Sequence, residues 1–93
     1  MRFTPDLIEE LNTLSRFDLA TSQQGIKIHK DADPAVIAAC ARLHRKGLIT
    51  RADGGYLTPL GRDAAEQVDM LQTILTSQPN GVAREVKEEF ALG

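Results

Sequence analysis

Six cationic side chains in the middle of this chain of 93 residues are its clearest candidates for chemistry. Residues 27–51 carry four more cationic than acidic side chains, although the whole chain has a net charge of −2. Such a cluster suits the phosphates of nucleic acid, which attract positive charge without regard to base sequence. We predict phosphate or base contacts for all six, with solvated surface charge as the alternative for each: Lys27, Lys30, Arg42, Arg45, Lys46 and Arg51.

Other reactive side chains form no recognisable site. Cys40 and His44 lie one helical turn apart, a spacing that metals use, but two ligands do not make a metal site. We expect Cys40 to be a core residue and His44 to be exposed near a helix end. Glu9 and Glu10 are expected on the polar side of a helix. Because the chain shows no phosphate loop, nucleophile elbow or paired carboxylates among apolar residues, we predict no enzyme activity, no cofactor and no metal.

Three Thr-Pro or Asp-Pro pairs predict where helices begin, since the first residue can cap a helix whose first position suits proline. The pairs start at Thr4, Asp33 and Thr58, and predict helices over residues 5–15, 34–46 and 59–76. Apolar residues recur at helical spacing in each of them. In the first helix we expect a buried stripe of Leu7, Ile8, Leu11 and Leu14; in the second, Val36, Ile37, Cys40 and Leu43 form the stripe.

Between the second and third helices the pattern changes to two short β-prone runs, residues 48–51 and 56–58. Asp53-Gly54 between them predicts a hairpin turn, because glycine supplies the positive φ that such turns need. Residues 22–29 fit either a short helix or a strand with Ile26 and Ile28 on one face, and we favour the helix. We predict one domain over residues 3–77, and a flexible acidic tail over 78–93.

The resulting order, helix, short helix, helix, hairpin, helix, resembles a winged helix-turn-helix domain. Leu43-His44-Arg45-Lys46-Gly47-Leu48-Ile49 is similar to the end of the recognition helix in MarR- and PadR-type regulators, and Tyr56-Leu57-Thr58-Pro59-Leu60-Gly61 to their second wing strand and following helix. Over residues 3–77 the chain also resembles a small bacterial family of uncharacterised proteins. The expected fold class is therefore mainly α with a small β-hairpin, in a winged helix-turn-helix arrangement.

This resemblance implies a small transcriptional regulator that binds double-stranded DNA with helix 34–46 and a short wing. If Val36, Cys40 and Leu43 face the core, Ala35, Ala38, Ala39 and Arg42 are exposed. Only Arg42 among these can read base edges by hydrogen bonding, since alanine offers just a methyl contact. The alternative is a winged-helix module that uses its alanine-rich helix to contact another protein and does not bind DNA.

The third helix carries a wider apolar face than one small domain can cover. We expect a homodimer through helix 59–76, with Val68, Leu71, Ile74 and Leu75 at the interface. The longest charge-free apolar stretch, residues 34–41, is too short to cross a membrane. Without an evident signal peptide, and with one cysteine, the chain is expected to be cytoplasmic and free of internal disulfides.

Overall fold

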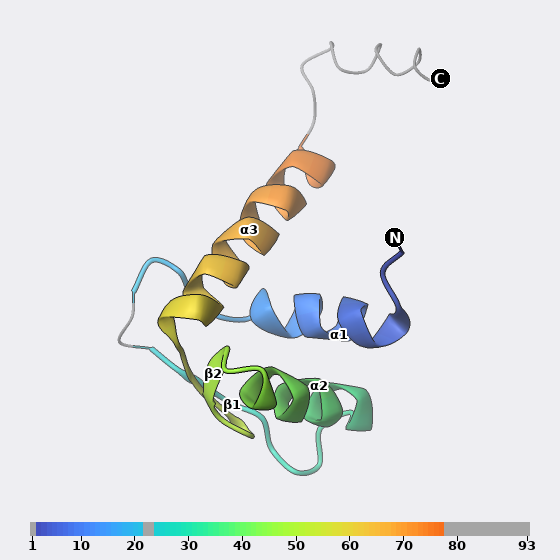
Figure 1. The fold of residues 1–93 in the computed structure, drawn as a ribbon, viewed down its shortest axis with the longest axis vertical. Helices are drawn as coiled ribbons and strands as arrows, with labels where there is room; N and C mark the ends of the chain where they lie inside the picture. Colours follow the sequence, from blue (N-terminus) through green and yellow to red (C-terminus); the bar gives the residue numbers. More distant parts are fainter. Residues whose placement is uncertain (1, 22–23, 78–93) are drawn as a thin grey trace.

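A computed structural model describes residues 2–21 and 24–77, which form three helices and a small antiparallel sheet (Figure 1). The elements in chain order are α1 (Pro5–Leu14), β1 (Ile26–Lys27), α2 (Pro34–Arg45), β2 (Ile49–Arg51), β3 (Gly54–Leu57) and α3 (Pro59–Thr76). The predicted class, mainly α with a small β-hairpin, is confirmed. The predicted acidic tail, residues 78–93, lies outside the described residues.

All three predicted helix starts are confirmed, each with the expected side-chain cap. The Thr4 hydroxyl accepts a hydrogen bond from the Leu7 N–H at 3.2 Å, and the Asp33 carboxylate accepts one from Ala35 at 2.9 Å. Thr58 accepts from Gly61 at 3.0 Å, so proline occupies the first turn of every helix. α1 and α2 end one residue earlier than predicted, and α3 has the predicted bounds.

The predicted short helix over residues 22–29 is wrong in its described part, residues 24–29, where Ile26 and Lys27 form strand β1. This strand pairs with β3, Ile26 opposite Gly55, and gives the sheet order β1-β3-β2. Glycine makes the pairing feasible, because a Cβ on Gly54 would collide with the carbonyl oxygen of Ile26. The Ile28 N–H extends the contact by donating to the Asp53 carbonyl at 2.8 Å. Hence α2 follows a strand and a turn.

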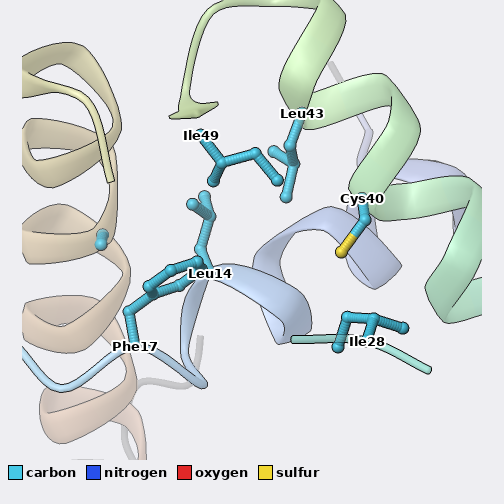
Figure 2. Packing of buried hydrophobic residues seen from close by; sticks show 7 residues of the cluster. Leu14, Phe17, Ile28, Cys40, Leu43 and Ile49 are labelled. Carbon is cyan, nitrogen blue, oxygen red and sulfur yellow. The ribbon is translucent and has the colours of Figure 1, made fainter. Parts of the chain in front are cut away.

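The core lies where α1, α2, the sheet and the start of α3 meet. Leu43 of α2 and Ile49 of β2 point toward Leu14 at the end of α1, with Phe17 and Cys40 on either side (Figure 2). Leu48 and Leu57 pack against this cluster, as do the half-buried Val36 and Val68. The expected burial of Ile8 and Ile37 is wrong, because both sit at the solvent edge of their helical stripes.

α3 contributes only its first turns to the core. Gly61 and Ala65 are buried, and an added Cβ on Gly61 would collide with the backbone carbonyl of Leu48. The helix then extends past α1 and away from the sheet (Figure 1), and its later apolar side chains are exposed. No helix within residues 2–21 and 24–77 is both long enough and apolar enough to span a membrane.

Candidate nucleic-acid interface

Glu10 of α1 is buried against two of the six predicted cationic contact residues. Its carboxylate accepts a hydrogen bond from Nε of Arg42 at 2.7 Å and another from Nζ of Lys46 at 2.5 Å. Arg42 also donates through Nη2 to the backbone carbonyl of Asp6 at 3.1 Å. These bonds fasten α1 to the second half of α2. The expected position of Glu10 on the polar side of its helix is therefore wrong.

The charges in this cluster stabilise one another. Burial raises the pKa of the Glu10 carboxyl, but the hydrogen bonds and positive charges of Lys46 and Arg42 outweigh that effect and hold the pKa below its ordinary value. The hydrogen bond to Glu10 also raises the pKa of Arg42. The expected exposure of Arg42 is wrong, since its side chain is only 21% exposed and its guanidinium faces α1. Glu10 and the Asp6 carbonyl therefore hold the guanidinium of Arg42 against α1.

Three of the remaining predicted residues line one groove, which has a volume of about 920 Å³ and lies between α2 and strands β1 and β2. Lys27 comes from β1, Lys30 from the turn that follows, and Arg51 from the end of β2. We call these three residues the cationic rim. His29 and His44 line the same groove, so two imidazoles accompany the three charges.

One acidic side chain, Asp53 in the hairpin turn, also lines the groove and lies 3.4 Å from Nζ of Lys27. That ion pair is exposed, and pairs of this kind contribute little to stability. Lys30, Arg51 and Arg45 are exposed and form no salt bridge with any described residue. Arg45 lies at the end of α2, next to His44 but outside the groove lining. The available charge is therefore concentrated on Lys30, Arg51 and Arg45.

The exposed face of α2 beside the groove is apolar. Ala35, Ile37 and Ala38 are exposed, as predicted for the two alanines. Ala39 is completely buried, and its expected exposure is wrong because it faces inward beside Cys40. With Arg42 turned toward α1, the exposed face from Pro34 to Ala38 carries no side chain that donates hydrogen bonds to base edges.

Cys40 is a core residue, as predicted, and His44 is exposed. Burial raises the pKa of the Cys40 thiol, so the sulfur stays in its neutral form at the floor of the groove. Within the described part of the chain, His, Cys, Asp and Glu side chains form no group of three that could hold a metal ion. Cys40 therefore contributes packing at this site.

The four residues predicted at a dimer interface lie along α3, but not at equal depth. Val68 is half-buried against the core, whereas Leu71, Ile74 and Leu75 are exposed. A shallow cavity of about 250 Å³ separates this part of α3 from α1, where Leu11 lies opposite Leu71 and Leu75. The exposed apolar face of α3 thus borders the half-buried Leu11 of α1.

The family model described as "Family of unknown function (DUF5669)" matches residues 1–76. The chain belongs to this family. The match agrees with the expected resemblance to a small uncharacterised family over residues 3–77, and it carries no activity with it. No curated protein and no solved structure matches the chain significantly.

In this member of the DUF5669 family, sequence reasoning missed the contact of Glu10 with Arg42 and Lys46. It left His29 open as a phosphate contact or part of a turn, and it did not bring His29 and His44 to one groove. A signal for Glu10 was present, because a residue four positions before Leu14 and three after Leu7 shares their face of the helix. The two histidines could not be placed, since they meet at the groove only after β1 pairs with β3. That pairing links residues far apart in the sequence.

Proposed function

We propose that this protein binds double-stranded DNA through its phosphate backbone, as a small DNA-binding regulator. The observation that supports the proposal is the cationic rim, in which Lys27, Lys30 and Arg51 come from three separate segments to one groove beside α2. Arg45 at the end of α2 adds a fourth charge. Phosphate contacts fix a protein on the duplex and carry most non-specific affinity.

A winged-helix arrangement agrees with this proposal. α2 leads through Gly47, whose φ is +81°, directly into the β2–β3 hairpin, as a recognition helix leads into its wing. The described part before α2 holds a strand and a turn in place of the expected short helix. Because the exposed start of α2 offers alanines in place of hydrogen-bond donors, we expect little preference among DNA sequences.

Fluorescence anisotropy of a labelled duplex, titrated at several salt concentrations, tests the proposal. If Lys30, Arg45 and Arg51, which have no salt-bridge partner among the described residues, each neutralise one phosphate, the slope of log K against log salt is expected to be about −2.7. The double variant Lys30→Gln, Arg51→Gln should weaken binding and make the slope about 2 units less negative. Arg2→Gln with Arg16→Gln is the matched control, because it removes two exposed charges outside the groove lining.

Absence of binding at low salt overturns the proposal. So does equal weakening by the control pair, which would mean that net charge alone attracts the duplex. Lys46 is unsuitable for charge reversal, since Lys46→Glu would place a second carboxylate against the buried Glu10.

A second candidate function, contact with another protein, rests on the exposed apolar start of α2. Ala35, Ile37 and Ala38 form a small patch with no charged side chain among them. Binding through such a patch resists salt and is abolished by Ala38→Glu. Ala39→Glu is not a usable test, because Ala39 is buried and a carboxylate there would disrupt the core.

We further propose that two copies of the chain associate through the exposed face of α3. Leu71, Ile74 and Leu75 are 44%, 62% and 73% exposed, and residues 70–77 contain no charged side chain. Exposed apolar surface of this extent is typical of a contact site rather than of a free surface. A two-fold contact would use the same face of α3 on both copies.

A further inference from the structure

We propose that the groove between α2 and strands β1 and β2 binds a small amphipathic anion, with an acidic head group and an apolar body. This inference goes beyond the proposed DNA contact, which uses only the charges at the rim of the groove. Sites for small molecules are concave, have volumes of roughly 300–1,000 Å³, and combine an apolar lining with a few polar groups. At about 920 Å³ this groove falls within that range and has both kinds of lining.

The floor of the groove is apolar and fixed by the core. Ile28 and Cys40 are buried, and Figure 2 shows the sulfur of Cys40 directed toward Ile28. Ala41 and Ile37 continue the apolar lining along α2. Because Ile28 and Cys40 belong to the hydrophobic core, the floor is formed before any ligand arrives. An apolar body placed along Ile37 and Ala41, which keep part of their surface accessible, buries apolar surface on binding, which is favourable.

The rim selects the sign of the ligand's charge. The lining contains one carboxylate, that of Asp53, against the three cations of the rim. Asp53 lies beside Lys27. Lys30 and Arg51 have no salt-bridge partner in the described part of the chain, so an incoming anion does not have to break an ion pair to reach them. The side chains of His29 and His44 add ring nitrogens that can donate hydrogen bonds to an acidic head group.

The apolar lining and the cationic rim call for different parts of a ligand. A purely ionic ligand would leave the apolar surface of Ile37 and Ala41 exposed to water. A neutral apolar ligand would lie beside the cationic rim without pairing with it. An amphipathic anion satisfies both, because its body covers Ile37 and Ala41 as its head reaches the rim. A medium-chain carboxylate is the simplest compound of this chemistry.

A ligand bound in the groove would affect DNA binding, and this expectation rests on the proposed function. A carboxylate held by Lys30 and Arg51 occupies the same charges that are proposed to contact phosphates, so ligand and duplex should compete. The binding of the ligand itself does not depend on DNA. The two proposals can therefore fail separately.

Titration of the full chain with octanoate, followed by ¹H–¹⁵N NMR, tests the site directly. We expect the amide signals of residues 27–30, 37–44 and 50–53 to shift. The shifts should saturate as octanoate is added, which gives a dissociation constant. Acetate carries the charge without the body, and octan-1-ol the body without the charge, so each should bind at least about tenfold more weakly, or about 1.4 kcal/mol. Shifts confined to α3, no saturation, or equal binding of either control compound would overturn the proposal.

Variants separate the two parts of the lining. Lys30→Gln with Arg51→Gln should weaken octanoate about tenfold and leave octan-1-ol unchanged, whereas Arg2→Gln with Arg16→Gln should alter neither. Ala41→Phe, which fills the groove from α2, should prevent both from binding. An unchanged octanoate affinity in the charge variant would overturn the proposal even if Ala41→Phe fails to fold.

Discussion

Glu10 shows how one buried side chain changes the meaning of a charge cluster. The sequence places six cations in residues 27–51, but the hydrogen bonds to Glu10 assign Arg42 and Lys46 to the α1–α2 contact. Charge density along the chain cannot distinguish these two from Lys30 and Arg51, because the distinction depends on a helix more than 30 residues away. The sequence therefore predicted where the cations are concentrated along the chain, but not that Arg42 and Lys46 pair with Glu10.

The Glu10 cluster predicts how stability depends on pH. A carboxyl whose pKa is lowered by folding stabilises the folded state above its unfolded value, near 4.5, and this contribution is lost as pH falls through the folded pKa. Glu10→Gln should lower the free energy of unfolding by about 2 kcal/mol at pH 7. Between pH 7 and pH 3, the free energy of unfolding should fall less in this variant than in the natural sequence. Urea unfolding at both pH values measures this.

Glu9→Gln is the matched control for that experiment, since Glu9 is adjacent and forms no salt bridge with a described residue. Glu9→Gln should lower the free energy of unfolding by less than about 0.5 kcal/mol. Equal destabilisation by the two variants would contradict the assigned role of Glu10.

At the scale of elements, the helices were predictable and the third strand was not. Thr4, Asp33 and Thr58 fix helix starts by contacts within three residues, which are visible in the sequence. β1 exists because Ile26 pairs with Gly55, a contact between residues 29 positions apart. Its two residues have no local preference strong enough to specify it, and an isolated strand of that length is not stable.

Thr58 joins two elements, and its substitution is a test of the α3 cap. Its hydroxyl accepts from the Gly61 N–H at 3.0 Å and donates to the Gly47 carbonyl at 2.6 Å, linking the start of α3 to the end of α2. Thr58→Ala removes both bonds and should lower the free energy of unfolding by about 1–2 kcal/mol. Thr58→Ser keeps the hydroxyl and should therefore retain most of the stability that Thr58→Ala loses. Thermal unfolding of both variants gives the comparison, and equal losses would refute the capping role.

At the scale of the whole molecule, the two surfaces proposed for binding lie on different elements. The groove is formed by α2, β1 and β2, whereas the apolar face follows α3 past α1 (Figure 1). Association through α3 therefore leaves the cationic rim accessible. The sequence predicted this division, because residues 70–77 are uncharged and the cations are concentrated in residues 27–51.

The proposed dimer predicts a concentration-dependent mass that one exposed residue controls. Leu75 is 73% exposed, so Leu75→Glu should leave the monomer folded while placing a charge in an apolar contact. Sedimentation equilibrium at high micromolar concentration should give about twice the 10.2 kDa chain mass for the natural sequence and the monomer mass for this variant. Thr73→Glu, on the opposite side of α3 with Arg62 and Glu66, adds the same charge and should remain dimeric. A monomeric natural chain, or dissociation by both variants, would contradict association through this face.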